Sequence, residues 1–121
     1  MDQSILTSIK KLLGIEESYT EFDVDIIMHI NSVLAVLQQL GVGPIEGLMI
    51  SDNTTTWNAL LSDSTRLNMV KSYMFLKVRV LFDPPATSFV LTSMEQQAKE
   101  LEWRLNVVRE NEISGVVIYN G

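Results

Sequence analysis

Apolar residues recur at three- and four-residue spacing in four segments of this chain, and glycine or proline separates each segment from the next. This spacing places the apolar side chains on one face of a helix. The segments cover residues 5–13, 23–40, 65–82 and 88–110. A shorter apolar segment around Trp57 predicts one further, short helix. We therefore expect an all-α protein with a small domain of four to five helices.

The segment over residues 65–82 is the best candidate for the centre of the core. Leu67, Val70, Met74, Val78 and Leu81 step by three and four, and further apolar residues widen this stripe. A helix that is apolar on most sides is usually buried on most sides. In the first segment, by contrast, Lys10 and Lys11 lie outside the apolar face.

Length and composition limit the classes of protein that remain. The chain has 121 residues, of which 46% are hydrophobic, and no cysteine. This length suits one domain, and the absence of cysteine excludes disulfides and thiolate metal sites. The N-terminus does not resemble a signal peptide, and the uncharged stretch over residues 26–45 is too polar for a membrane span. We expect a helical domain over residues 1–112.

Residues 113–121 differ in character, and we expect them to form an extended C-terminal tail. Val116 to Tyr119 are β-branched or aromatic, which indicates a strand, yet the chain offers no evident partner strand. Two interpretations remain open with equal weight. The tail is either a frayed terminus or a segment that docks on a partner by strand addition.

The search for chemistry predicts no catalytic residue, no cofactor and no metal. His29 is the single histidine and lies one turn after Asp25, a spacing that suits a base and its orienting acid but is more typical of a surface histidine. The acids between Glu16 and Asp25 lack the spacing and the central glycine of a calcium loop. Trp57 and Trp103 are more typical of core or interface anchors than of ligand platforms.

Charge bears on nucleic-acid binding in two opposing ways. The net charge of −6 argues against wrapping nucleic acid by bulk charge. The segment over residues 65–82 nevertheless carries four bases and no acid: Arg66, Lys71, Lys77 and Arg79. They spread around the helix and form no stripe. A small helical DNA-binding or DNA-packaging protein therefore remains the alternative function.

Three blocks of the sequence resemble the head-to-tail connector proteins of long-tailed bacteriophages. They are IIMHINSVLAVLQQLGVGP (26–44), KSYMFLKVRVLFDPPATSF (71–89) and MEQQAKELEWRLNV (94–107). The blocks cover most of the chain in the expected order, and it is their combination that makes the resemblance specific.

The resemblance implies a structural adaptor without enzymatic activity. Such proteins form a homo-oligomeric, usually dodecameric, ring beneath the portal, in the neck of a virion that is assembled in the host bacterial cytoplasm. The ring extends the channel for double-stranded DNA and supports a head-completion (stopper) or tail-completion protein, and no membrane is involved. The residues that correspond by position to the portal- or partner-docking segment are Ile113, Val116, Val117, Ile118 and Tyr119. Candidate acids for the channel wall, which would repel phosphates, are Glu16, Glu17, Glu21, Glu46 and Asp52.

Overall fold

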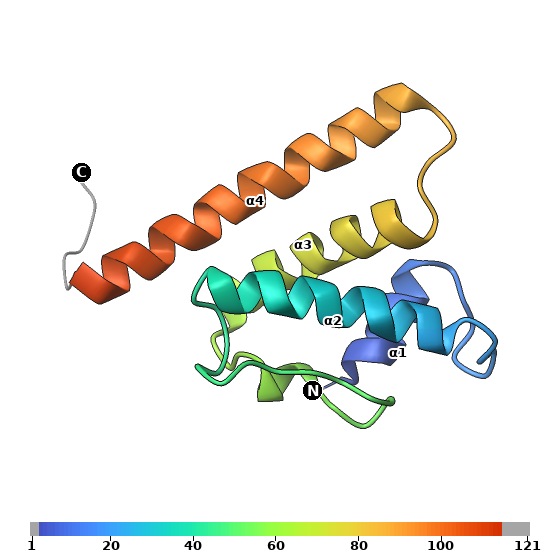
Figure 1. The fold of residues 1–121 in the computed structure, drawn as a ribbon, viewed down its shortest axis with the longest axis horizontal. Coiled ribbons are helices and arrows are strands. Elements are labelled where there is room, and N and C mark those ends of the chain that lie inside the picture. The colour runs from blue at the N-terminus through green and yellow to red at the C-terminus, as the bar shows by residue number, and fades with distance from the viewer. Residues whose placement is uncertain (1–2, 115–121) are drawn as a thin grey trace.

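A computed structural model describes residues 3–114 of the chain, with side chains up to residue 107 (Figure 1). Its elements are α1 (Ile5–Leu12), α2 (Asp23–Gln39), the 3-10 turn η1 (Trp57–Ala59), α3 (Ser64–Phe82) and α4 (Ser88–Ser114). Within these residues the only β-type pairing is an isolated antiparallel bridge between Ser4 and Thr56. The expected all-α domain is confirmed.

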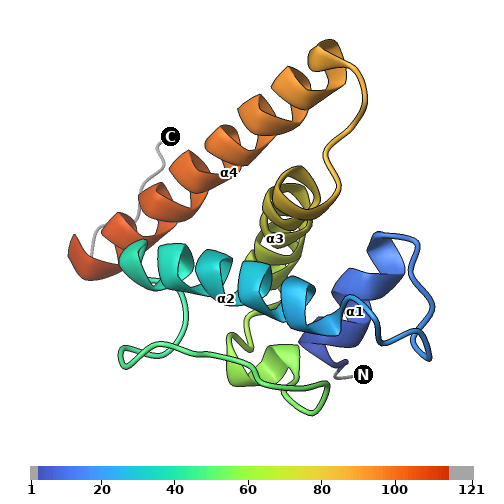
Figure 2. The ribbon, with the colours of Figure 1, turned by 45° about the vertical axis from the view of Figure 1, so that its right-hand side comes forward.

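Helix α3 is the centre of the fold, because it packs against α1, α2 and α4 (Figures 1 and 2). The side chains of Val70, Tyr73, Met74 and Val78 are completely buried. The Asp63 side chain begins the helix by accepting a hydrogen bond from the Thr65 backbone N–H. The predicted stripe fails only at its C-terminal end, where Leu81 is half exposed.

Helix α2 presents one face to this core and leaves the other open. Its buried face matches the predicted spacing and consists of Ile26, Ile30, Val33, Leu34 and Leu37. Val24 and Met28 lie off this face, with exposed fractions of 78% and 57%. Two apolar side chains thus stay in solvent on a helix whose other side is fully packed.

Helix α4 forms an antiparallel hairpin with α3 through the turn over residues 83–87 (Figure 1). Ala98 and Leu105 of its predicted seam are buried. The buried Tyr73 hydroxyl donates a hydrogen bond to Glu102 Oε2 at 2.7 Å and ties the two helices together. At its far end, α4 extends past the C-terminal end of α2 (Figures 1 and 2).

The end of α4 corrects one expectation. The helix continues through Ile113 to Ser114, so Ile113 is helical and does not begin an extended tail. The prediction placed a break here because Gly115 follows and the residues beyond it favour a strand. Helical hydrogen bonding instead persists up to the glycine. Residues 115–121, including Val116, Val117, Ile118 and Tyr119, lie outside the described part of the chain.

Lys10 lies outside the predicted apolar face of α1, yet it is buried. Its exposed fraction is 2%, and its ammonium group donates hydrogen bonds to the backbone oxygens of Glu17 and Tyr19 at 3.0 and 2.6 Å. The same nitrogen lies 2.9 Å from Asp23 Oδ1. Lys10 is buried because the loop between α1 and α2 folds over it, and the lysine in turn fixes that loop. Lys11, by contrast, is exposed.

Replacing Lys10 should therefore destabilise the domain. Lys10→Met leaves Asp23 without its cation and two carbonyl groups without their donor, so we expect a loss of about 3 kcal/mol in the free energy of unfolding. Urea titration followed by circular dichroism measures this loss. Lys11→Met is the matched control and should change stability by less than about 0.5 kcal/mol. Equal effects of the two substitutions would contradict the role of the buried ammonium.

The Tyr73–Glu102 hydrogen bond predicts a pH-dependent stability. Burial first, and then the hydrogen bond and the negative charge of Glu102, raise the pKa of Tyr73 well above its ordinary value of 10.0. The folded state therefore keeps a proton that the unfolded state loses, and stability should fall as the pH rises above 10.

Tyr73→Phe tests this dependence because it removes only the hydroxyl group. The variant should lose about 2 kcal/mol at pH 7 and show a shallower fall of stability above pH 10. Urea titrations between pH 7 and 11 compare the two proteins. An equally steep fall in both would show that another group governs the alkaline loss.

Candidate interaction surfaces

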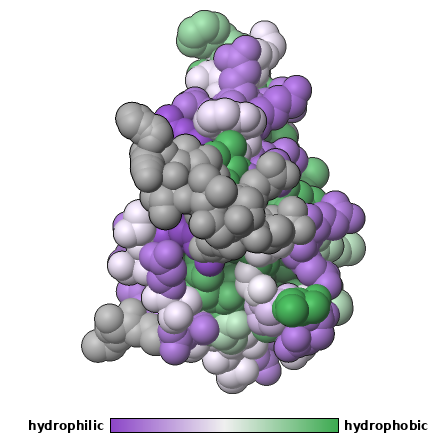
Figure 3. All heavy atoms as spheres, turned by 90° about the vertical axis from the view of Figure 1, so that its left-hand side faces the viewer, coloured by the Kyte–Doolittle hydropathy of each residue, from purple (hydrophilic) through white to green (hydrophobic). Residues whose placement is uncertain are grey.

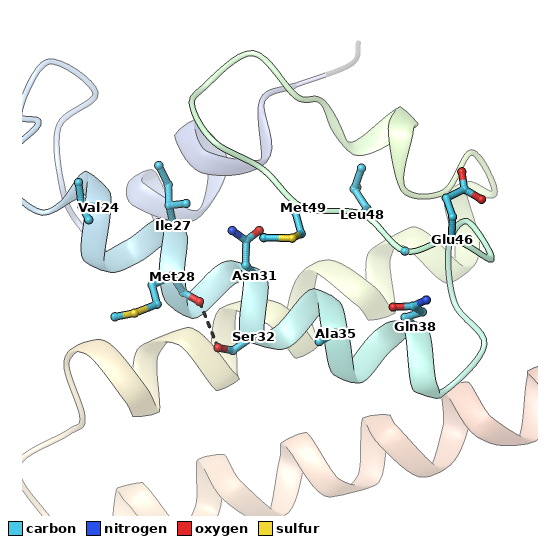
Figure 4. A pocket seen from close by; sticks show the side chains of 11 residues that line it. Val24, Ile27, Met28, Asn31, Ser32, Ala35, Gln38, Glu46, Leu48 and Met49 are labelled. Carbon is cyan, nitrogen blue, oxygen red and sulfur yellow. Dashed lines mark hydrogen bonds between the residues drawn. The ribbon is translucent and has the colours of Figure 1, made fainter.

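A groove lies between the open face of α2 and the connection that follows this helix (Figure 4). Its volume is about 840 Å³. The side contributed by α2 includes Val24, Met28 and Ala35, and the opposite wall includes Leu48 and Met49. The groove is thus mainly apolar, and Met49 in its wall is 75% exposed.

Two amide side chains of α2 hold this wall in place. Asn31 forms a pair of hydrogen bonds with the backbone of Ile50: its Nδ2 donates to the carbonyl oxygen at 3.0 Å, and its Oδ1 accepts from the N–H at 2.8 Å. Gln38 Nε2 donates to the Ile45 carbonyl oxygen at 2.9 Å. The wall is therefore fastened at both ends, which keeps the groove from collapsing.

Gly47 allows the second of these contacts. Its φ of +86° lies in the left-handed region, and a Cβ atom at this position would lie 2.6 Å from Gln38 Oε1. A glycine here lets the backbone pass close to the amide side chain. In the sequence, Asn31, Gln38 and Gly47 have no feature that distinguishes them from other helix and loop residues. The pairing of Asn31 with Ile50, nineteen residues away, also has no local sequence pattern that predicts it.

A second group of exposed apolar side chains lies at the start of α4. Phe89 and Val90 have exposed fractions of 82% and 43%. Further along α4, Trp103 is 65% exposed, whereas Trp57 is buried and donates a hydrogen bond to Ser8 Oγ at 3.1 Å. Only Trp57 is therefore a core anchor. Figure 3 shows apolar patches separated by hydrophilic side chains on one side of the molecule.

The candidate catalytic pair does not assemble a site. His29 lies in a hollow with Asp25, Phe22 and Phe82, and its ring meets that of Phe82 edge-on at a centroid distance of 6.4 Å. Among the hydrogen bonds of residues 3–114, none joins Asp25 to His29. This contact pattern is that of a histidine packed at the edge of an aromatic cluster.

The structure separates the candidate channel acids into groups. Glu16, Glu17 and Glu21 are exposed in the loop before α2, whereas Glu46 is exposed beside the last turns of this helix. A helix of 17 residues spans about 25 Å, so these groups lie at opposite ends of it. They therefore do not form one patch within a single copy.

Asp52 is exposed further along the same connection as Glu46. Its carboxylate accepts hydrogen bonds from the hydroxyl and the backbone N–H of Thr54, at 2.6 and 2.9 Å. These bonds lower the pKa of Asp52 below its ordinary value, so the carboxylate is ionised at neutral pH. Among the described side chains, residues 3–107, no three His, Cys, Asp or Glu groups lie close enough together to hold a metal ion.

The bases of α3 face partners within the domain. Arg79 lies near Asp83 and donates to its backbone oxygen, and Lys71 lies over the Trp57 ring at 5.5 Å. Arg66 Nε lies 3.7 Å from Asp63, and Lys77 lines a hollow with two acids of α4, Glu95 and Glu102. Arg66, Arg79 and Lys71 thus contact other groups of the domain, and the four bases do not form one basic stripe along α3.

A family model described as phage connector protein matches residues 5–112 of this chain. The chain belongs to the phage connector protein family. The match covers the four-helix domain almost completely, and it confirms the resemblance to head–tail connectors that the three sequence blocks indicate. No curated protein and no solved structure shows significant similarity to the chain.

The phage connector family is a family of structural proteins, and its role lies at the head–tail interface of the phage. None of the helices in the described part of the connector is both long and apolar enough to cross a membrane. The exposed surfaces described above are the groove on α2, the apolar start of α4 and the acidic loops.

Asn31→Ala should open the wall of the groove. The variant loses both hydrogen bonds to Ile50, and we expect a destabilisation of about 2 kcal/mol. Hydrogen exchange at the Ile50 amide should rise more than at the amides of α3. Ser32→Ala, the control, removes an exposed bond to Met28 within the same helix and should leave Ile50 protected. Unchanged exchange in Asn31→Ala would contradict the proposed fastening.

Proposed function

We propose that this phage connector forms a dodecameric ring beneath the portal, in the neck of the virion, after assembly in the host cytoplasm. The ring extends the channel for double-stranded DNA and provides a platform for a stopper or tail-completion protein. The observation that carries this proposal is the family match over residues 5–112, because it covers the whole folded domain.

The distribution of exposed apolar side chains supports a ring. A ring built from identical copies in head-to-tail contact needs two different surfaces on each copy. The connector has a concave surface, the groove on α2, and a separate protruding one at Phe89 and Val90 at the start of α4. Exposed apolar groups of this kind mark surfaces that other proteins cover.

The acids support a channel that DNA passes without being held. Each copy carries a net charge of −6, and a ring multiplies this charge around its axis. Because Glu16, Glu17 and Glu21 lie at the opposite end of α2 from Glu46, we propose that one of these regions faces the channel. The C-terminal segment, Ile113 with Val116 to Tyr119, is proposed to contact the portal ring.

Imaging of the connector mixed with its cognate portal tests the ring. We expect a ring on the tail-facing end of the portal by negative-stain electron microscopy. A variant that lacks residues 113–121 should keep the circular dichroism spectrum of the domain but decorate fewer portals. The ring is refuted if the full-length connector never decorates that end.

Charge reversal tests which acids face the channel. Two variants are compared in assembled phage: Glu16→Lys with Glu17→Lys and Glu21→Lys, and Glu46→Lys alone. The set that faces the channel should slow DNA release, because lysines attract the phosphates that the acids repel. Ejection kinetics measured at low and high salt should show the slowing only at low salt. Normal DNA ejection in both variants would contradict the proposal that these acids line the channel.

A further inference from the structure

The start of α4 is a helix end that lies outside the core. No residue over 79–97 is buried, and this range includes α4 from Ser88 to Gln97. Residues 84–94 also carry no charged side chain, and Phe89 among them is 82% exposed. A helix segment of this length gains most of its stability from packing. An uncharged helix end with an exposed aromatic side chain is therefore a surface that a second protein would stabilise by covering it.

The groove on α2 is lined by side chains that suit an aromatic group on a helix. Met28 on α2 and Met49 on the opposite wall have exposed fractions of 57% and 75% (Figure 4). Methionine adapts its shape to a neighbour, and its sulfur makes favourable contacts with aromatic rings. The groove volume of about 840 Å³ lies within the range of about 300–1,000 Å³ that is usual for binding pockets. The groove therefore has room for a phenylalanine side chain and the helix turn that carries it.

The charges of these two surfaces are complementary. Among the described residues that line the groove, Glu46 alone is charged, and its side chain is exposed. Helix α4 has no acid in its first turn, whereas α2 has Asp23 and Asp25 there. An acid near the first turn of a helix is favourable, because it offsets the positive end of the helix dipole. The groove thus supplies the negative charge that the start of α4 lacks.

The two surfaces lie on opposite sides of the domain, which indicates a second copy of this chain as the occupant. In Figures 1 and 2 the start of α4 lies above α2, and the connection that forms the groove wall lies below it. The start of α4 therefore cannot enter the groove of its own chain. Two different surfaces on opposite sides let identical copies meet head to tail, and contacts of this type close into rings.

We propose that the start of α4 of one copy docks in the α2 groove of the next copy, with Phe89 between Met28 and Met49. As the lateral contact of a ring, this contact rests on the proposed function. Glu46 then lies between copies, beside the first turn of the neighbouring α4. The acids that remain to face the channel are those of the loop before α2.

Disulfide trapping in the isolated protein tests the contact, because the natural chain has no cysteine. A tagged Val90→Cys protein is mixed with an untagged protein that carries either Met28→Cys or Met49→Cys, so a disulfide between the two gives a product of distinct mass on a non-reducing gel. In the control the untagged protein carries Leu12→Cys, at a position that is 54% exposed but lies on α1, away from the groove. Oxidation at about 1 mM protein detects even a contact whose Kd is in the millimolar range.

Val90→Cys should form a disulfide with at least one of the two groove positions about tenfold faster than with Leu12→Cys, because docking raises the effective concentration of the pair. A rate equal to that of the Leu12 mixture overturns the proposal. A product made mainly of Val90 homodimers also overturns it, since that would pair two α4 starts with each other.

A second substitution in the tagged protein separates docking from random collision. Phe89→Ala should lower the rate to that of the Leu12 mixture and leave the urea unfolding curve unchanged, because Phe89 is exposed. Trp103→Ala, which removes another exposed aromatic side chain of α4, should leave the rate unchanged. An undiminished rate in Phe89→Ala refutes the docking of this side chain. No portal is present, so this contact and the ring on the portal can fail independently of each other.

Discussion

Every other part of this connector depends on the burial of α3. Val70, Tyr73, Met74 and Val78 are completely buried, and the helix contacts α1, α2 and α4. Removing apolar surface of this extent from water is the main favourable term in the folding of a small domain. Since α3 occupies the centre, α2 and α4 each have one face inside and another free. The free faces carry the surfaces on which a structural protein acts.

Polar contacts then determine the shape of the irregular segments. Lys10 binds the loop before α2 through two backbone oxygens and Asp23, and Asn31 binds the connection after α2 through the Ile50 backbone. Each contact satisfies backbone groups that no helix or sheet satisfies. The second contact fixes one wall of the groove on α2.

The helices were largely predictable because apolar spacing and chain breaks are local signals. The prediction placed the second helix over residues 23–40, and α2 spans Asp23–Gln39; Pro84 and Pro85 follow α3 as expected. The candidate site was less predictable. Neither the burial of Lys10 nor the pairing of Asn31 with Ile50 has a local pattern, since each joins segments distant in sequence. The candidate channel acids were assigned to two loops, but the sequence did not show that Glu16, Glu17 and Glu21 lie at the opposite end of α2 from Glu46.

The sequence by itself determined the all-α class, the helix positions, the buried faces of α2 and α3, and the resemblance to phage connectors that the family match confirms. Each of these follows from side chains close together in the chain, or from their order along it. Only the tertiary structure decided which lysine is buried, which tryptophan is exposed and where the groove lies. The groove arises where helix α2 meets a connection up to nineteen residues away. The burial of Lys10 depends on the loop that folds over it, and the exposure of Trp103 depends on how α4 packs.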